Sequence, residues 1–244
     1  MSLRSSIPPG DVAVPDRVRA LAGNAEPVPV WRNELGGVTF RVGALYVKWG
    51  PRNLEASMAE EAERLAWAAR WTPVPEVRDH GETDTEEWLV TSALEGESAV
   101  APAWVARPDV AVRAIAVGLR ALHDVLPVEE CTYDWSVPTR LARAAARGIA
   151  LPAELRDPPS VDRLVVCHGD ACSPNTLIGP NGRWIAHVDL GALGTADRWA
   201  DIAVATMSLG WNYGPGWDET FLDAYGVDPD PVRTAYYRAL WNAT

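Results

Sequence analysis

The chain has 244 residues, of which 48% are hydrophobic and 23% charged, as expected for one large globular domain or two modest ones. Acidic residues outnumber basic ones by 33 to 22, and the net charge of −11 argues against nucleic acid or an anionic membrane as a partner. A cationic ligand is compatible with this charge, although an acidic surface can also serve solubility alone. No apolar run approaches the roughly 18 residues that span a bilayer, so we expect a cytoplasmic protein, either monomeric or weakly dimeric.

The three cysteines favour no disulfide framework, because their number is odd and no CxxC pair is present. Cys167 and Cys172 flank His168 and Asp170, which raises zinc binding as an alternative. No second ligand cluster occurs elsewhere in the sequence. We therefore expect these two residues and Cys131 to be reduced packing residues.

The first third of the chain is rich in short β-prone runs. After a Pro- and Gly-rich start with a short helix near residues 12–21, we expect antiparallel strands at residues 28–30, 38–42 and 45–47. Apolar residues at helical spacing predict a helix over residues 54–71, which Pro73 and Pro75 end.

Two more strands are expected at residues 76–80 and 87–93, and the chain after Gly96 is predicted to be mostly helical, with clear repeats at 110–124 and 139–147. A β-rich part with one main helix, followed by a helical remainder, predicts an α+β protein with two lobes. We expect the lobes to comprise residues 1–93 and 94–244.

Residues 165–191, VVCHGDACSPNTLIGPNGRWIAHVDLG, contain the pattern with the clearest chemistry. Asp170 follows a hydrophobic strand, Asn175 comes five residues later, and Asp189 follows a predicted hairpin. Phosphoryl transfer needs a carboxylate that orients the attacking hydroxyl, and oxygen ligands for Mg²⁺. This spacing predicts that Asp170 faces the acceptor while Asn175 and Asp189 face the metal. Singly, each motif is weak, and His168 on its own is more typical of a structural hydrogen bond.

The upstream lobe contains groups that suit a nucleotide. Lys48 ends an apolar strand, where a lysine is unusual unless it is paired or meets a phosphate. Glu61 on the following helix is a candidate partner, although Glu55 and Glu60 compete on spacing alone. The Leu35-Gly36-Gly37 turn suits a loop that covers phosphates, but it is not a GxGxxG motif.

These motifs resemble the aminoglycoside phosphotransferase family, in particular the 3′-phosphotransferases. The similarity runs from about residue 30 to the end and is carried by HGDACSPNTLI, HVDLGALGTADRWADIA, Tyr46-Val-Lys48, WTPVP at 71–75, Ala121-Leu-His123 and Ala235-Tyr-Tyr237. The resemblance implies a protein-kinase-like fold, with ATP or GTP held between a nucleotide-binding lobe and a catalytic lobe.

The resemblance also implies residue roles. Asp170 corresponds to the catalytic base, Asn175 and Asp189 to the Mg²⁺ ligands, and Lys48 with its partner Glu61 to the group that contacts the phosphates. For the remaining positions it implies a nucleobase-stacking residue, a hinge that reads the base edge, and a carboxylate that braces the catalytic loop: Tyr46; Ser92 and Ala93; Asp201. From the residues alone, we expect Gly36 and Gly37 to cover phosphates and His168 to give structural support.

The sequence departs from the family where the acceptor would bind. Members that take polycationic aminoglycosides hold them with acidic residues, but the insertion here is short, from 148 to 162, with Glu154, Asp157 and Asp162 as its acids. At the other equivalent positions we expect acceptor contacts from Ser173, Trp211, Trp241, Asn242 and the terminal carboxylate of Thr244. The two tryptophans could instead be core residues.

Three functions follow as hypotheses. The first is transfer of the γ-phosphoryl group to the 3′-hydroxyl of an aminoglycoside, a role in antibiotic resistance. The second keeps the chemistry and changes the acceptor to a sugar, an amino alcohol or another hydroxylated metabolite. The third, a nucleotide-binding pseudokinase, is disfavoured because Lys48, Asp170, Asn175 and Asp189 are all present.

Overall fold

The computed structural model describes residues 8, 12–33, 36–52 and 57–244. The chain divides into two compact units. The first contains the described residues up to Arg70 together with Pro75–Leu94, and the second contains Trp71–Val74 and Glu95–Thr244. The expected boundary after residue 93 stays a prediction.

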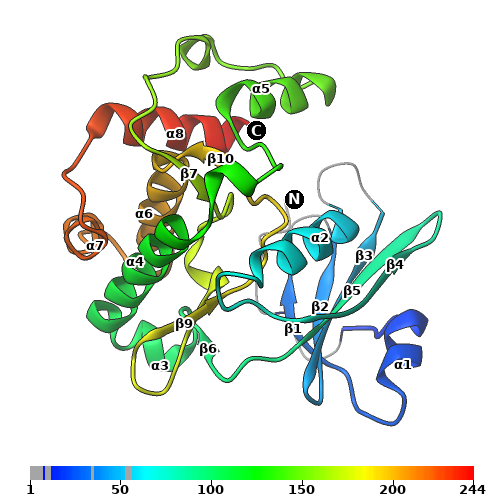
Figure 1. Cartoon of the computed structure of the whole chain (residues 1–244). Coiled ribbons are helices and arrows are strands. Elements are labelled where there is room, and N and C mark those ends of the chain that lie inside the picture. The colour runs from blue at the N-terminus through cyan, green and yellow to red at the C-terminus, as the bar shows by residue number, and fades with distance from the viewer. Residues whose placement is uncertain (1–7, 9–11, 34–35, 53–56) are drawn as a thin grey trace. The chain divides into compact units, whose positions relative to one another are not determined.

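The first unit is built on a five-stranded antiparallel sheet with the order β1-β2-β3-β5-β4 (Figure 1). Three antiparallel pairs join strands that are consecutive in the chain, β1 with β2, β2 with β3 and β4 with β5, as the strand and turn pattern of the sequence predicts. The strands are β1 (Val28–Arg32), β2 (Val38–Val42), β3 (Leu45–Pro51), β4 (Val77–Glu82) and β5 (Glu86–Ser92).

One helix covers each face of this sheet. Successive strand residues point to opposite faces, so Val47 joins Phe40 in a core that Val18 of α1 (Asp16–Ala22) completes. Lys48, one residue on, points to the other face, where α2 (Met58–Ala68) packs on β4 and β5. Predicted helix positions 54–56 lie outside the described residues. The start of α2 is fixed by Glu87, whose carboxylate accepts a hydrogen bond of 2.8 Å from the Met58 amide.

The second unit is mostly helical, as predicted. Its two helix pairs in close contact are α4 with α7 and α6 with α8. The helices are α3 (Pro102–Val105), α4 (Pro108–Val125), α5 (Val137–Ala146), α6 (Trp199–Tyr213), α7 (Asp218–Tyr225) and α8 (Pro231–Ala243), with short 3₁₀ turns η1 (Val128–Glu130), η2 (Ala153–Arg156) and η3 (Ser173–Asn175).

Two small antiparallel sheets in the second unit carry the loops that matter for chemistry. One pairs β7 (Leu164–Cys167) with β10 (Gly194–Asp197), and the other has the order β6-β8-β9, with β6 (Glu97–Ser98), β8 (Thr176–Ile178) and β9 (Trp184–His187). Asp170 follows β7, and Asp189 follows β9. The sequence did not predict β6 and β10, which span only two and four residues.

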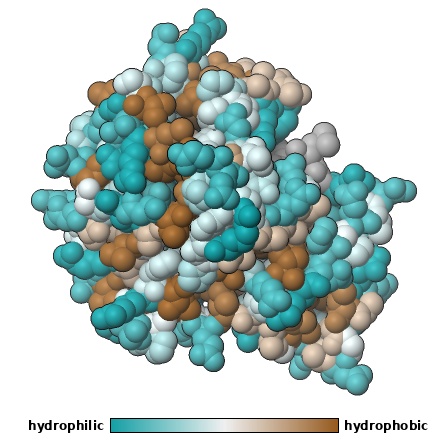
Figure 2. All heavy atoms as spheres, in the orientation of Figure 1, coloured by the Kyte–Doolittle hydropathy of each residue, from teal (hydrophilic) through white to brown (hydrophobic). Residues whose placement is uncertain are grey.

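The visible surface is mixed. On the face shown in Figure 2, hydrophobic residues lie in small groups among hydrophilic ones. Within the described part of the chain, every helix is too short or too polar to cross a membrane.

Candidate active site

The loop that carries Asp170 leaves a buried strand and turns at a glycine. Val165 and Val166 of β7 are fully buried, and Gly169 has a φ of 86°, which favours glycine. A Cβ atom at this position would lie 2.1 Å from the carbonyl oxygen of Ala192. The backbone at this turn therefore requires glycine before Asp170.

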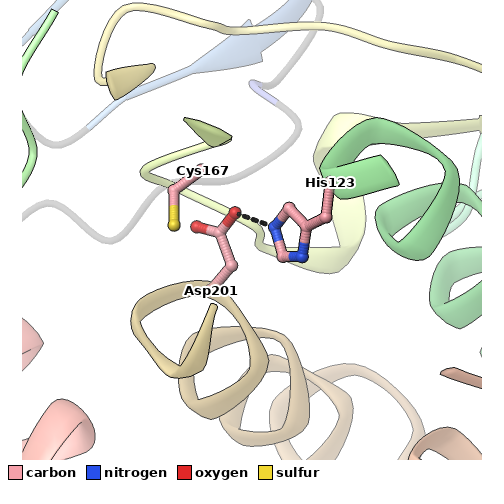
Figure 3. A group of neighbouring side chains, drawn as sticks. All are labelled: His123, Cys167 and Asp201. Atoms are coloured by element: carbon pink, nitrogen blue, oxygen red, sulfur yellow. Dashed lines mark hydrogen bonds and ion pairs between the residues drawn. The ribbon is translucent and has the colours of Figure 1, made fainter. Parts of the chain in front are cut away.

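Asp201 of α6 holds the backbone of this loop in place. Its carboxylate accepts hydrogen bonds from the backbone amides of His168 and Gly169, the latter at 2.9 Å. His123 of α4 contacts the same carboxylate through Nε2 at 2.9 Å, and its Nδ1 lies 2.7 Å from the Tyr225 hydroxyl (Figure 3). Burial opposes the charge of Asp201, but the bonds from His123 and His168 hold its pKa below the usual value.

The same cluster provides a test of the zinc alternative. His123, Cys167 and Asp201 offer ligand atoms within 4.8 Å of one another, and all three are buried (Figure 3). Burial and the charge of Asp201 raise the pKa of the Cys167 thiol well above its usual value, which opposes the thiolate that zinc requires. Because the Asp201 oxygens already accept two backbone amides, the cluster serves as a structural brace. The cysteines are free thiols.

Asp170 and Asn175 are joined directly. The amide nitrogen of Asn175 donates to the backbone carbonyl of Asp170 at 2.9 Å and to its Oδ2 at 3.0 Å. These bonds direct the nitrogen of the Asn175 amide toward Asp170 and leave its oxygen for another group. Oδ1 of Asp170 is buried and has no hydrogen-bond partner among the described residues.

Asp189 lies close enough to Asp170 for their charges to interact. Burial first, and then the negative charge of Asp189, raise the pKa of Asp170. Asp189 has a φ of 65°, and it is the only non-glycine residue with a positive φ in the described chain. Such strained conformations concentrate at functional sites. His168 donates through Nε2 to the Val188 carbonyl at 3.0 Å and so fixes the residue before Asp189.

In the first unit, Lys48 and Glu61 form an ion pair. Nζ of Lys48 lies 2.7 and 2.8 Å from the two carboxylate oxygens of Glu61, whose side chain is only 8% exposed. Glu60 pairs instead with Arg64 at 2.8 Å, and Glu55 lies outside the described residues. The geometry therefore selects Glu61 among the three acids.

Tyr46 shares the sheet face of Lys48, two residues along β3. The guanidinium of Arg41 lies 4.9 Å from the centre of the Tyr46 ring and donates to its hydroxyl at 3.0 Å. One face of the ring is thus covered by Arg41, and a nucleobase would have to stack on the other.

The predicted turn and hinge are both tied into the sheet. The amide of Gly37 donates to Oδ1 of Asn33 at 2.7 Å, and Gly36 has a φ of 86°; Leu35 lies outside the described residues. Backbone amides of Ser92 and Ala93 donate to the carbonyls of Glu76 and Ala44, at 2.9 and 2.8 Å. Both of these amides are therefore already engaged within the sheet.

The residues expected to contact the acceptor fall into separate groups. Ser173 is 1% exposed, and its amide donates to the Ser208 hydroxyl at 2.9 Å, so it anchors the catalytic loop to α6. Glu154 and Asp157 are exposed in and after η2. Asp162 forms an ion pair with Arg198 at 2.6 Å.

A second group gathers at the ends of α6 and α8. The rings of Trp211 and Trp241 lie 5.6 Å apart, and Asn242 is exposed. Thr244 is held by two arginines that the sequence did not single out: its hydroxyl accepts from Arg140 at 2.9 Å and its carbonyl from Arg147 at 3.1 Å. Arg140 lies in α5, and Arg147 follows this helix. In the sequence, their spacing resembles that of charged residues on the solvated face of any amphipathic helix.

The five-stranded sheet with its lysine–glutamate pair, and the helical unit with its two aspartates and asparagine, define the protein-kinase-like class of phosphotransferases. The model of the phosphotransferase enzyme family matches residues 18–237, and the chain belongs to this family.

Curated relatives of this chain are named as phosphotransferases and kinases. An aminoglycoside 3′-phosphotransferase of Streptomyces fradiae is 40% identical over 228 residues, which cover 80% of this chain and 84% of that protein. A streptomycin 3″-kinase of Streptomyces griseus is 30% identical over 94% of this chain and 95% of that protein.

Solved structures agree with this assignment. An aminoglycoside-3′-phosphotransferase of type VIII superposes with a TM-score of 0.75 at 29% identity, covering 94% of this chain and 98% of that chain. An aminoglycoside phosphotransferase from Streptomyces rimosus, solved with ADP and streptomycin, gives a TM-score of 0.71 at 28% identity, covering 93% of this chain and 96% of that one. The fold and the enzyme class predicted from the sequence are confirmed: the chain is a phosphotransferase with an alcohol group as acceptor.

Proposed function

We propose that the chain transfers the γ-phosphoryl group of ATP or GTP to a hydroxyl of an aminoglycoside, most simply the 3′-hydroxyl. The observation that carries this proposal is the cluster of Asp170, Asn175 and Asp189, supported by relatives that are named aminoglycoside 3′-phosphotransferases. The net charge of −11 suits a cationic acceptor.

Asn175 and Asp189 would hold Mg²⁺. The fit rests on donor chemistry: a carboxylate and an amide oxygen are ligands that Mg²⁺ prefers, and a cation would relieve the repulsion that raises the pKa of Asp170. When bound, the ion neutralises charge on the phosphates of the nucleotide.

Asp170 would orient the acceptor hydroxyl and take its proton. As the hydroxyl oxygen forms its bond to the γ-phosphorus, the bond from that phosphorus to the bridging oxygen breaks and the nucleoside diphosphate leaves. The hydroxyl proton moves to the carboxylate, and the buried Oδ1 without a partner is the free acceptor. Burial, the larger cause of the raised pKa of Asp170, remains when a cation is bound and makes the carboxylate a better base than an exposed aspartate.

Lys48, held by Glu61, would contact the α- and β-phosphates. The open face of Tyr46 would stack on the nucleobase, and the carbonyls of Ser92 and Ala93 would receive its edge. Gly36 and Gly37 would form the turn that covers the phosphates, a turn shaped by the hydrogen bonds from their amides to Asn33.

One set of observations favours a second acceptor class, a sugar or an amino alcohol. Ser173 is buried, Asp162 is paired with Arg198, and Thr244 is engaged by Arg140 and Arg147, so few carboxylates remain for ammonium groups. Glu154 and Asp157 are the exposed acids of this region.

ADP release in the presence of Mg·ATP and single acceptors separates these functions. We expect turnover with aminoglycosides that have a 3′-hydroxyl, such as kanamycin, and none with 3′-deoxy analogues. Turnover with sugars or amino alcohols alone would establish the second class. Nucleotide binding without turnover on any acceptor would point to a pseudokinase.

A further inference from the structure

Tyr225, the last residue of α7, carries a buried hydroxyl to which the proposed reaction gives no role. Its side chain is 1% exposed, and the hydroxyl lies 2.7 Å from Nδ1 of His123 in α4. Arg120, also in α4, donates to the backbone carbonyl of Tyr225 at 3.0 Å, and its guanidinium lies 5.6 Å from the centre of the tyrosine ring. The packing of α7 on α4 therefore fixes this hydroxyl at His123.

The partners of His123 indicate which of its ring nitrogens carries the proton. Nε2 lies 2.9 Å from Oδ2 of Asp201, and an ionised carboxylate can only accept hydrogen bonds. Burial raises the pKa of the Tyr225 hydroxyl, so this group keeps its proton, and among the described residues Nδ1 of His123 is the acceptor that it reaches. The arrangement that satisfies all of these groups is a neutral imidazole that accepts from Tyr225 at Nδ1 and donates to Asp201 from Nε2.

The orientation of His123 decides how firmly Asp201 is held. Oδ2 of Asp201 accepts from Nε2 of His123, which faces it in Figure 3, and from the His168 amide, while Oδ1 accepts from the Gly169 amide at 2.9 Å. A rotated imidazole, or one with its proton on Nδ1, would direct a lone pair or a C–H group at the carboxylate and remove one of its donors. Because the two amides form the turn just before Asp170, a shift of Asp201 would displace the catalytic carboxylate.

Resting on the proposed role of Asp170 as the base, we propose that Tyr225 is a positioning residue for phosphoryl transfer. Its hydroxyl proton holds the imidazole of His123 with Nε2–H on Asp201, and Asp201 in turn holds the turn before Asp170 in the geometry that the acceptor hydroxyl requires. Because Tyr225 is buried, it acts through His123 and Asp201 and contacts neither nucleotide nor acceptor.

Steady-state kinetics of ADP release compare wild type with Tyr225→Phe, which removes the hydroxyl and keeps the ring. The variant should lose about tenfold in kcat, while KM for ATP and KM for the acceptor stay nearly unchanged, because the groups that bind both substrates are intact. The loss of a buried hydrogen bond should also lower Tm by a few degrees.

Phe221→Leu is the matched control for this loss of stability. Phe221 is fully buried on the same helix and stacks on Tyr225, with ring centroids 6.2 Å apart, but it contributes no polar atom to the hydrogen bonds that lead to Asp170. Leucine keeps the position apolar, and Arg120 still holds Tyr225. The control should lower Tm to a similar extent and keep the wild-type kcat at temperatures where all three proteins are folded.

Nitrogen-15 NMR of the histidine rings tests the hydrogen bond without any acceptor present. At His123, wild type and Phe221→Leu should both show a protonated Nε2 and an unprotonated Nδ1 that accepts a hydrogen bond. In Tyr225→Phe the Nδ1 signal should move toward that of a nitrogen without a hydrogen-bond donor.

A wild-type kcat in Tyr225→Phe, an equal loss of kcat in Phe221→Leu, or a wild-type His123 with a proton on Nδ1 would overturn the inference. Failure of the proposed acceptor is seen elsewhere, in a wild-type enzyme that phosphorylates no aminoglycoside. The same variants are then compared on the alcohol that the wild type does phosphorylate, with the same outcomes, and the ring spectra are unaffected by that choice.

Discussion

The carboxyl group of Asp170, the base of the proposed reaction, is buried at the expense of stability in the protein without its ligands. Burial and the nearby charge of Asp189 disfavour its ionised form, and Asn175 stabilises that form only in part. Lys48 and Glu61 show the opposite balance, because each neutralises the other. Sequence spacing could identify Lys48, Asp170, Asn175 and Asp189, since their order along the chain reflects the strands that carry or precede them. Spacing alone left Glu61 in competition with Glu55 and Glu60.

The buried charge of Asp170 should lower the free energy of unfolding, and this cost can be measured. A pKa raised in the folded state means that folding favours the protonated form, so the free energy of unfolding falls as pH rises through and above the ordinary aspartate range. Asp170→Asn should therefore raise Tm at neutral pH by about 2–4 °C, which corresponds to about 1 kcal/mol. Thermal unfolding of both proteins measures this. The gain should shrink in acid, where Asp170 is protonated, and a constant difference at all pH values would contradict the explanation.

Helices and strands were predictable where the spacing of apolar residues in the sequence matched the period of the element. Strand β2 alternates between buried and half-buried residues, and α2 and α4 carry amphipathic repeats. Helix α6 escaped a separate prediction because it is apolar on nearly all sides, with ten of its residues buried, from Trp199 to Leu209. The contact of Arg140 with Thr244 was unpredictable for a different reason: it depends on how α5 and α8 approach, which local sequence does not encode.

Two helix glycines give a matched test of packing at the scale of elements. In α4, a Cβ atom on Gly118 would lie 2.4 Å from the Trp184 indole, whereas Gly210 in α6 has open space. Gly118→Ala should destabilise the protein by about 1–3 kcal/mol through overpacking. Gly210→Ala should stabilise it by about 0.5–1 kcal/mol through helix propensity.

Chemical denaturation of the two alanine variants, measured side by side, shows whether each substitution lowers or raises the free energy of unfolding. Equal effects in the two variants would show that propensity alone governs these positions and that the contact between α4 and Trp184 is loose.

For the molecule as a whole, the sequence predicted the fold class, and its charge also limited the classes of partner. The two-part α+β organisation followed from the change in sequence character near Gly96, and the net charge of −11 argued against nucleic acid as a partner. The acceptor was less predictable, because the residues expected to contact it lie in a loop, at the end of α6 and at the end of α8, and none of these shares a motif.

The excess of acidic residues predicts how salt affects the enzyme. A net charge of −11 should steer a polycationic acceptor toward the protein, so kcat/KM for an aminoglycoside should fall as ionic strength rises. A neutral acceptor should show little change. Initial rates over a salt series measure both. If salt affected both acceptors equally, the acidic surface would serve solubility alone.

The division of roles between the two aspartates is tested most directly by the affinity of Asp170→Ala and Asp189→Ala for ATP, measured by calorimetry with and without Mg²⁺. Asp170→Ala should bind Mg·ATP nearly as tightly as wild type while its kcat falls by several orders of magnitude, because its carboxylate acts on the acceptor hydroxyl. Asp189→Ala should lose the Mg²⁺-dependent part of nucleotide binding. Identical nucleotide affinities in the two variants would contradict the assignment of a base at 170 and a metal ligand at 189.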